Sequence, residues 1–337
     1  MEDEIEDLVR GSLRQALATA PQDISAALAE FGWQDLVYTD EPLAFTALFE
    51  EQGYLAADTN ALDIAVATVL GLDGRTPVLW PVNSYSNAQE MGGSGVVVAD
   101  GVSLRGQLTA TDDGPAPDAG VAVRGQANAT DNILAPVGGR MRMLAVSSIE
   151  ERALGGMARG SSWVSRRVWG SPTADFGSWL EVETRARLAI ASELVGVMQR
   201  IVELAAEQVS SRRQFGRPIA ANQAVRFRLA EAHVEVVGAK ALIAAAWEDG
   251  SPASAGWAKA VAGSAHDAVA KHAMQVCGAV GLSNEHPLPA LVRRGIALDA
   301  LLGPAMQQQP RIGRELIAHQ RDMQASRHSL ASAVGWF

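Results

Sequence analysis

Two long helical stretches, joined by one short break, constrain this chain more than any other feature of its sequence. From residue 179 onward, apolar residues recur at helical spacing, which predicts a long amphipathic helix; they are Leu188, Ile190, Leu194, Val195, Met198, Ile201, Val202 and Ala205. The run ends at Arg212 and Arg213, where cations favour a helix C-terminus. Gly216 and Pro218 then break it, and Asn222 stands where a second long helix would begin. Long helices joined by short breaks predict an antiparallel bundle.

The rest of the chain changes character twice. Residues 1–73 predict short helices, placed at Ile5–Thr19, Ile24–Phe31, Pro42–Gly53 and Asn60–Leu70. Residues 74–170 are rich in Val, Thr, Ser and Gly and predict strands, with weaker candidates at 121–123, 132–134 and 141–147. Asp100-Gly101 suits a type I′ turn, which predicts a hairpin between Val96–Ala99 and Val102–Leu104.

The C-terminal part predicts helices at 179–211, 221–249, 253–280, 287–302 and 310–332. The fold class that follows is α+β and mainly helical. We expect an N-terminal helical domain over 1–73, a small middle β domain over 74–170 and a C-terminal four-helix bundle over 171–337.

Charge and composition exclude several classes of function. The net charge of −10 argues against nonspecific nucleic-acid binding. The single cysteine, Cys277, excludes an internal disulfide, and His266 and His272 lie six positions apart, so no metal pair is expected. The chain opens with acidic residues and has no apolar run of membrane-spanning length. We therefore expect a cytoplasmic protein without a membrane or nucleic-acid partner.

The break between the two long helices carries a motif. It reads Arg212-Arg213-Gln214-Phe215-Gly216-Arg217-Pro218-Ile219, followed by Gln223. This resembles the Arg-x-Gln-Phe-Gly-x-Pro signature of the acyl-CoA dehydrogenase family, whose order of helices, small β domain and long bundle is also similar. The resemblance implies that Arg212, Gln214, Phe215 and Gln223 contact an FAD held mainly by a neighbouring subunit. An arginine fork suits its phosphates, and such a site requires an oligomer.

A second segment, Gln275-Val276-Cys277-Gly278-Ala279-Val280-Gly281, is similar to the Gln-x-x-Gly-Gly-x-Gly segment of that family. The resemblance implies that Gln275, Gly278 and Gly281 meet the adenosine and pyrophosphate part of FAD. Ala279 replaces the second glycine of the pair. A glycine after an apolar helical run is also a stop signal, and both interpretations can hold together.

The catalytic base of the family has no clear counterpart. The implied reaction removes a proton next to a thioester carbonyl and a hydride from the next carbon, and it needs one carboxylate. Where that family has a Glu in a loop, this chain has Leu302 or Gly303, and neither takes a proton. A second location in the family falls near Ala186. Glu183 lies one turn earlier and Glu193 two turns later, so neither matches that location, and Glu183 is kept as the candidate base. Asp299 is shorter and about one turn away.

The β region departs from the family as well. In the family, a strand with a Gly-x-Lys-x-(Trp/Phe) pattern lies beside the flavin ring. The stretch Leu104–Thr111 keeps the glycine and lacks the aromatic residue.

Together these departures make the chain similar to the short, base-lacking subunit of actinobacterial heterotetrameric acyl-CoA dehydrogenases of the steroid side-chain type. That resemblance implies an α2β2 enzyme with FAD, an acyl-CoA substrate, a partner that supplies the Glu, and an electron-transferring flavoprotein as electron acceptor. Two alternatives stay open: a non-catalytic scaffold or acyl-CoA-binding protein with this fold, and a homomeric dehydrogenase with a displaced base such as Glu183.

Overall fold

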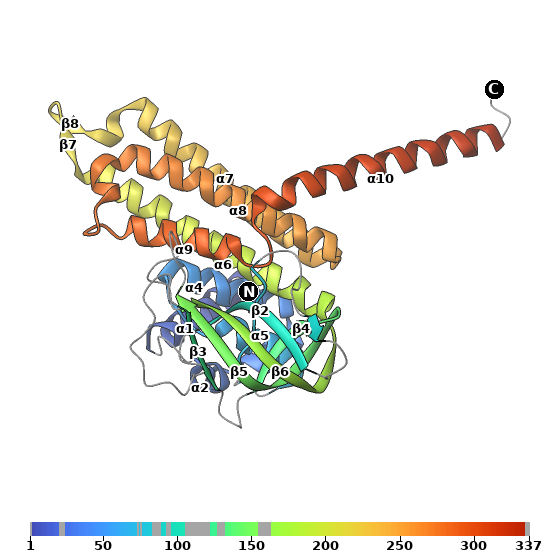
Figure 1. The fold of residues 1–337 in the computed structure, drawn as a ribbon. Coiled ribbons are helices and arrows are strands. Elements are labelled where there is room, and N and C mark those ends of the chain that lie inside the picture. Colours follow the sequence, from blue (N-terminus) through green and yellow to red (C-terminus); the bar gives the residue numbers. More distant parts are fainter. Residues whose placement is uncertain are drawn as a thin grey trace.

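The computed structural model describes residues 2–19, 24–72, 74, 76–82, 89–91, 96–104, 122–126, 132–153 and 163–333. Short helices come first, a sheet follows, and long helices complete the chain (Figure 1). The N-terminal helices are α1 (Glu2–Thr19), α2 (Ser25–Phe31), α3 (Trp33–Thr39), α4 (Glu41–Leu55) and α5 (Ala61–Val69). Helix α3 was not predicted; it begins directly after Gly32, whose φ of 83° ends α2 and turns the chain.

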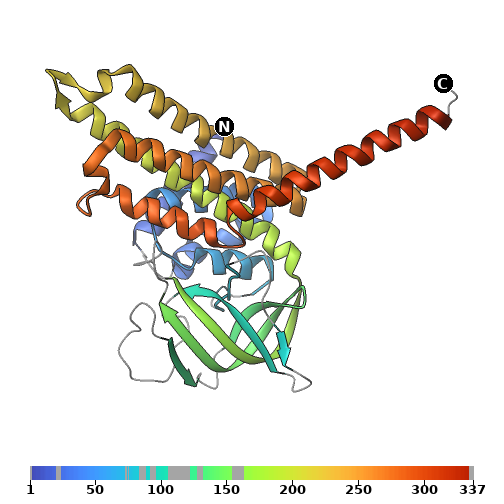
Figure 2. The same ribbon diagram turned by 45° about the horizontal axis from the view of Figure 1, so that its top comes forward.

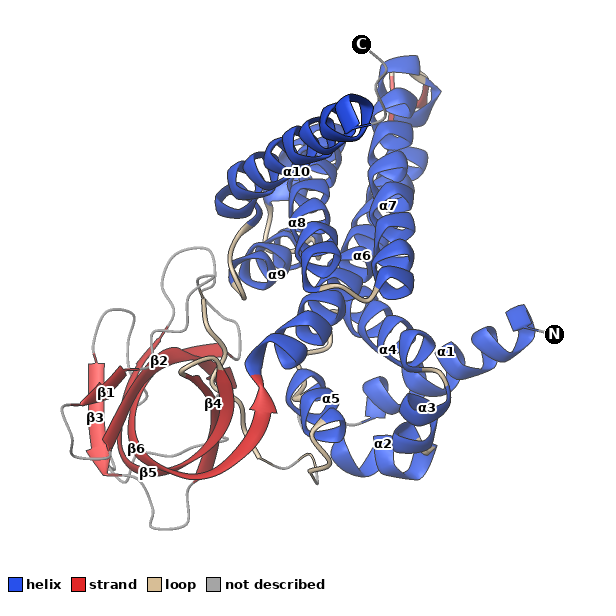
Figure 3. Ribbon diagram, turned by 90° about the vertical axis from the view of Figure 1, so that its right-hand side faces the viewer, coloured by secondary structure: helices blue, strands red, loops and turns tan. Residues whose placement is uncertain are grey.

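The strands form one antiparallel sheet that curls strongly in Figure 3. They are β1 (Gln89–Met91), β2 (Val96–Leu104), β3 (Ala122–Gln126), β4 (Asn132–Val137), β5 (Arg140–Ala153) and β6 (Trp163–Ser178). The order is β1-β2-β6-β5-β3, and β4 pairs with β5. The sheet has an apolar core of its own, which includes Val97, Ile133, Leu144, Ile149 and Val168. The stretch 105–111, compared above with the family strand beside the flavin, lies outside the described residues.

The predicted hairpin at Asp100-Gly101 is wrong. Strand β2 continues through both residues and pairs with β6, with Asp100 opposite Arg167. A Cβ on Gly101 would lie 2.7 Å from the carbonyl oxygen of Trp80. Trp80 and Val102 exchange backbone hydrogen bonds of 2.8 and 2.9 Å. The glycine therefore admits a neighbouring segment to the strand, and it does not make a turn.

The C-terminal helices are α6 (Trp179–Ser211), α7 (Gln223–Asp249), α8 (Pro252–Cys277), α9 (Leu288–Ala300) and α10 (Ala305–Ala333). Helix α6 is the central one, since it packs against α4, α7, α8 and α9. Helix α10 leaves the body and extends outward (Figures 1 and 2). It begins at Ala305 instead of 310, with Pro310 inside it, and α8 ends at Cys277 instead of 280 because Gly278 has a φ of 65°.

The mainly helical α+β fold class is confirmed. Strand β6 runs past residue 170 to Ser178 before α6 starts. The division into domains at 73 and 170 stays a prediction. Among the described residues, no helix is both long and apolar enough to span a membrane.

The N-terminal helices meet the bundle at a very close helix contact. A Cβ added to Gly196 of α6 would overlap the carbonyl oxygen of Glu50, and one added to Gly53 of α4 would overlap the carbonyl oxygen of Glu193. Two facing glycines thus let the backbones of α4 and α6 touch. This contact ties the first seventy residues to the bundle that carries the predicted site.

Candidate functional site

The predicted flavin-contact motif forms an exposed hairpin at one end of the bundle (Figure 1). Strands β7 (Arg213–Gln214) and β8 (Arg217–Pro218) pair across Phe215 and Gly216. Both turn residues have positive φ, 52° and 78°, as a type I′ turn requires. Glycine accepts that conformation readily, whereas phenylalanine does not. Phe215 is also 99% exposed.

Two of the arginines hold the hairpin in shape. Arg213 donates to the carbonyl oxygen of Gly216 at 3.1 Å, and Arg217 donates to Asn222 Oδ1 at 2.8 Å. Asn222 stands at the start of α7 as predicted, but its side chain does not cap the helix. Arg212, Gln214 and Gln223 are exposed. A strained, exposed phenylalanine beside exposed polar groups indicates a surface that a second molecule covers.

The glycine segment lies at the same end of the bundle, between α8 and α9 (Figures 1 and 2). It forms a short 3-10 helix, η3 (Gly278–Leu282). Gln275 and Gly278 are exposed. Gly281 is buried, and a Cβ there would lie 2.9 Å from Cys277 Cβ and 3.1 Å from Leu288 Cδ2. Packing between α8 and α9 thus accounts for Gly281, whose predicted contact with FAD stays a prediction.

The Leu302–Gly303 loop, where the resemblance places the family's glutamate, is buried and tightly held. Leu302 is fully buried at a φ of 55°, and Gly303 has a φ of 96°. The Leu302 N–H donates to the carbonyl oxygen of Pro81 at 2.9 Å, which ties the loop to the segment beside the sheet. Gln308 donates to the carbonyl oxygens of Leu302 and Gly303 at 3.1 and 2.7 Å.

Lys259 holds the same loop from inside the bundle, and we call the hydrogen bonds of Lys259 and Gln308 to this loop the clamp. It is fully buried, and its Nζ donates to the Gly303 carbonyl oxygen at 2.6 Å, to Asp299 Oδ1 at 3.1 Å and to the Asp299 carbonyl oxygen. Burial lowers the pKa of Lys259 to about 8, against the opposing effect of Asp299. The Asp299 carboxylate also accepts from the Ala305 N–H at 3.1 Å. Both partners of the Asp299 carboxylate therefore serve to hold the loop in place.

Glu183 is buried, although it lies on the long helix α6. Its Oε1 pairs with Arg187 Nη2 at 2.7 Å. Burial raises the pKa of Glu183, and Arg187 and Arg311 oppose that effect. A buried carboxylate with a raised pKa has one property of a general base, although structural ion pairs share it.

The Glu183 pair lies close to the clamped loop. Arg187 Nη1 and Gln308 Oε1 lie 3.4 and 3.9 Å from the point where a Cβ on Gly256 would stand. Gln308 in turn holds Leu302 and Gly303. The two positions considered for the base, far apart in sequence, thus come near each other in the fold.

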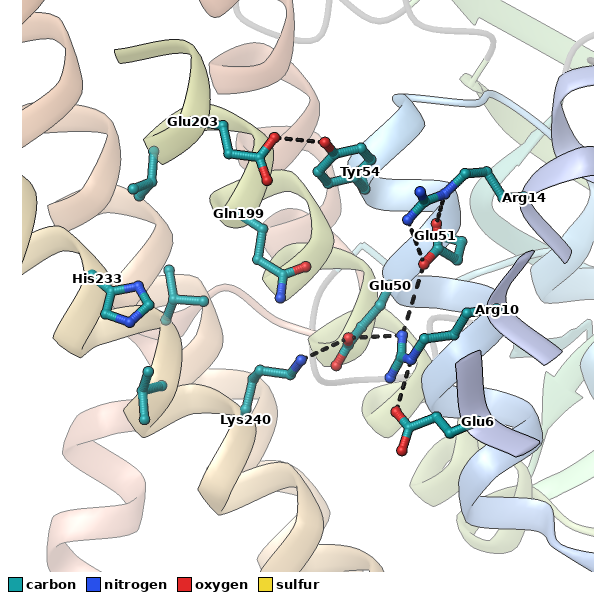
Figure 4. Close-up of a pocket in the computed structure, with 13 residues that line it drawn as sticks. Glu6, Arg10, Arg14, Glu50, Glu51, Tyr54, Gln199, Glu203, His233 and Lys240 are labelled. Atoms are coloured by element: carbon teal, nitrogen blue, oxygen red, sulfur yellow. Dashed lines mark hydrogen bonds and ion pairs between the residues drawn. The ribbon is translucent and has the colours of Figure 1, made fainter. Parts of the chain in front are cut away.

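A separate polar pocket of about 720 Å³ lies between α1, α4, α6 and α7 (Figure 4). Glu50 Oε2 lies 3.0 Å from both Arg10 Nη1 and Lys240 Nζ, and Arg14 pairs with Glu51 at 2.6 Å. These ion pairs join α1 and α7 to α4. The pocket contains none of the residues that the motifs predicted. Over the described residues, no cluster of His, Cys, Asp and Glu could hold a metal ion.

Removing the Lys259 clamp is expected to destabilise the chain. Lys259→Met leaves the carboxylate of Asp299 and the loop carbonyls without their buried donor, and we expect a loss of about 2 kcal/mol in the free energy of unfolding. Urea unfolding followed by circular dichroism measures it. Lys271→Met is the matched control, because Lys271 is 71% exposed in its pair with Asp267 and should cost under about 0.5 kcal/mol. Equal losses for both variants would contradict the clamp.

Comparison with known protein families shows which family the C-terminal part of the chain resembles. Residues 180–320 match the family model described as acyl-CoA dehydrogenase, C-terminal domain. The C-terminal part of the chain is therefore similar to the acyl-CoA dehydrogenase family. It is 33% identical to the acyl-CoA dehydrogenase IpdE2 of Mycolicibacterium smegmatis over 39% of this chain and 42% of that one. It is 34% identical to FadE27 of Mycobacterium tuberculosis over 45% and 43%. The match thus spans less than half the length of each of these two relatives.

Solved structures show the same fold over nearly the whole chain. The ChsE4–ChsE5 complex from Mycobacterium tuberculosis contains a chain with a TM-score of 0.67 and 20% identity, covering 93% of this chain and 97% of that one. The Tcur3481–Tcur3483 steroid ACAD gives a TM-score of 0.71 and 19% identity, covering 96% and 100%. At these identities the likeness concerns the fold.

The acyl-CoA dehydrogenase domain that residues 180–320 match implies FAD as the cofactor. The chain's own residues fit that cofactor in part. Arg212 and Gln214 offer exposed donors suited to phosphate oxygens, and Phe215 offers an exposed ring. All three lie on a protruding hairpin, which suits contact with a cofactor bound mainly by another subunit (Figure 2).

Proposed function

We propose that this chain is one subunit of a heteromeric, FAD-dependent acyl-CoA dehydrogenase that introduces an α,β double bond into an acyl-CoA thioester. The observation that carries the proposal is the clamped Leu302–Gly303 loop. Where the family has a glutamate, this loop presents a buried leucine and a glycine, both at positive φ. The partner subunit then supplies the catalytic carboxylate.

The chain's contribution is to the cofactor. Arg212, Gln214, Phe215 and Gln223 would reach the FAD of the partner, and Gln275 and Gly278 would approach it from the neighbouring turn at the same end of the bundle (Figure 1). Bound FAD supplies the acceptor for the hydride that leaves the acyl chain. An electron-transferring flavoprotein would take up the electrons.

The comparisons support a heteromer and suggest a substrate class. Both fold neighbours described above are complexes of two differently named chains, and one is named a steroid ACAD. We therefore infer an α2β2 assembly acting on a steroid-derived acyl-CoA. A cytoplasmic location stays a prediction of the sequence.

The decisive experiment measures flavin and mass together. The chain is purified alone and co-expressed with a second acyl-CoA dehydrogenase-like chain, and each sample is examined by visible absorption and size-exclusion chromatography with mass detection. We expect the lone chain to be colourless and inactive, and the complex to carry less than one flavin per chain. One flavin per chain in the lone protein would contradict the heteromeric enzyme. A complex that forms but stays colourless would favour the non-catalytic scaffold.

Glu183 supports a second candidate, a homomeric enzyme with a displaced base, because it is buried and lies near the clamped loop. Glu183→Gln removes the proton-accepting group and keeps the shape. The heteromeric proposal expects turnover of the assembled enzyme to fall less than about tenfold, whereas loss of a general base lowers turnover by about 100-fold or more. The measurement is dye reduction with acyl-CoA at saturating concentration.

A further inference from the structure

A trough runs along α7 on the side of that helix that faces α1 and α4. The polar pocket of Figure 4 forms one half of the trough, and a second hollow of about 940 Å³ forms the other half. Arg10, Glu50 and Lys240 line both hollows, so the two adjoin. The second hollow is lined mainly by apolar side chains, among them Ile5, Leu43, Val237, Ala244 and Trp247.

Each wall of the trough is one face of a helix. The α7 wall has lining residues at positions 233, 237, 240, 244 and 248, and the α4 floor has them at 43, 46, 50 and 54. Spacings of three and four place side chains on one side of a helix. From 233 to 248, α7 rises by about 22 Å, which is the length of a helix of about four turns. The trough therefore matches the length of a further helix laid beside α7.

The apolar side chains of the trough are open to solvent. Ile5 is 52% exposed and Val237 is 51% exposed, while Leu43 and Trp247 are half-buried. Ile5 lies on α1 and Val237 lies on α7, so apolar side chains stand on both walls. An exposed apolar groove with polar groups around it is typical of a site that a partner covers.

Negative charge surrounds these apolar side chains. The trough is lined by three cations, Arg10, Arg14 and Lys240, against six carboxylates, which leaves a surplus of three negative charges when His233 is neutral. All three cations already pair with Glu50 or Glu51. The six carboxylates are those of Glu6, Asp40, Glu50, Glu51, Glu203 and Glu248.

Part of the surplus lies beside the apolar hollow, where Asp40 and Glu248 belong to the lining. Over the described ranges, neither of these carboxylates pairs with a cation, although Asp40 accepts from the Leu43 N–H at 3.0 Å. Glu6, also in this lining, pairs with Arg10 at 2.7 Å. The occupant that this half of the trough favours is therefore both apolar and positively charged.

We propose that the trough is a docking site for a basic amphipathic helix of another protein. The helix would lie beside α7 with bulky apolar side chains between Leu43 and Trp247, and its lysines or arginines would lie near Asp40 and Glu248. The apolar half of the trough lies toward the end of α7 that is remote from the β7–β8 hairpin. The contact uses none of the residues assigned to FAD, and it does not depend on the proposed function.

A model helix and two arginine variants test the site. The probe is two tandem copies of Lys-Leu-Ala-Lys-Lys-Leu-Ala with blocked ends, which places leucines on one face of a helix of about four turns. The same peptide with glutamate in place of lysine is the charge control. Ala244→Arg puts a long cation into the trough, whereas Ala245→Arg makes the same change at the next residue, which lines neither hollow. Both alanines are exposed, so the fold should persist, which circular dichroism checks.

Isothermal titration calorimetry with the full chain measures binding of the peptides. We expect the lysine peptide to bind, and we expect either the glutamate peptide or the Ala244→Arg variant to lower the affinity at least about tenfold, since like charges would then meet in the trough. Ala245→Arg should change the affinity less than about threefold, because its charge lies outside the contact. A wild-type chain that does not bind the lysine peptide would overturn the proposal. Equal effects of the two arginine variants would also overturn it, because they would show only nonspecific attraction to an acidic chain.

Glu248→Gln tests the same contact without added bulk. Glu235→Gln is its control, because Glu235 is an exposed residue of α7 that lines neither hollow. We expect Glu248→Gln to weaken binding of the lysine peptide by about threefold or more and Glu235→Gln to leave it within about twofold; equal effects would contradict the site. Analytical ultracentrifugation tests a different occupant. If Ala244→Arg abolished self-association of the chain and Ala245→Arg preserved it, a second copy would occupy the trough, and the proposal would be wrong.

Discussion

Gly196→Ala is expected to lower the free energy of unfolding by about 3 kcal/mol or more. The new methyl group would overlap the Glu50 carbonyl oxygen on α4, which is backbone and cannot rotate away. Helices α4 and α6 would have to separate along a contact that holds the N-terminal helices to the bundle. Forced overpacking at a backbone contact costs about 1–3 kcal/mol and sometimes more. Urea unfolding monitored by circular dichroism measures the loss.

Gly11→Ala is the matched control for this substitution. Gly11 lies inside α1, is exposed, and has nothing within 4 Å of its missing Cβ. Alanine there should stabilise the chain by about 0.5–1 kcal/mol, because glycine is a poor helix former. The close contact of α4 and α6 would be disproved if Gly196→Ala were neutral or stabilising like the control.

Glu193→Ala should destabilise the chain by about 3–5 kcal/mol. Glu193 is 3% exposed; one carboxylate oxygen pairs with Arg294 and the other accepts from Gln52 Nε2 at 2.9 Å. Removing it leaves the guanidinium of Arg294 largely buried with an incomplete set of partners, a change that costs about this much. Arg294 Nη2 would keep its bond to the Ala57 carbonyl oxygen at 2.6 Å. The contact joins α4, α6 and α9, so thermal and urea unfolding should both register the loss.

Glu207→Ala, on the same helix, is the matched control for Glu193→Ala. Its side chain is 65% exposed and lies 3.5 Å from Arg200. An exposed pair of this kind contributes about 0–1 kcal/mol. A Glu193→Ala variant as stable as Glu207→Ala would show that the buried pair makes no net contribution.

The helical parts of the fold were predictable because their apolar spacing is long and regular. Helix α6 begins at Trp179 and ends at Ser211, as predicted. The prediction at Asp100-Gly101 was wrong because an Asp-Gly dipeptide indicates a turn only where no distant segment requires the glycine. Here the close approach of the Trp80 backbone requires Gly101. Helix α10 begins before Pro310 because the preceding loop is fixed by Lys259 and Gln308, which no local pattern reveals.

The break between α6 and α7 was predictable because it depends on a local motif. Arg212, Gln214 and Phe215 lie at that break, on an exposed hairpin that the sequence did not predict, and their contact with FAD stays a prediction. The environments of Glu183 and Asp299 depend on Arg187 and Lys259. Arg187 lies on the same helix as Glu183, whereas Lys259 on α8 reaches Asp299 on α9. The burial of Arg187 and Lys259 arises only when the helices pack, so the sequence alone did not reveal it. The signal that could have found the clamp was Lys259 itself, which stands between Ala258 and Ala260 in the alanine-rich run of α8.

The clamped loop has a consequence for the evolutionary history of the chain. A glutamate written at position 302 would place a carboxylate where Leu302 packs in the core, and burying an unpaired charge is strongly unfavourable. At position 303 the φ of 96° would strain any side chain. Neither position can regain the family's carboxylate by a single substitution without disturbing the fold. A return of the carboxylate to this loop would therefore require further substitutions among the residues that pack around it.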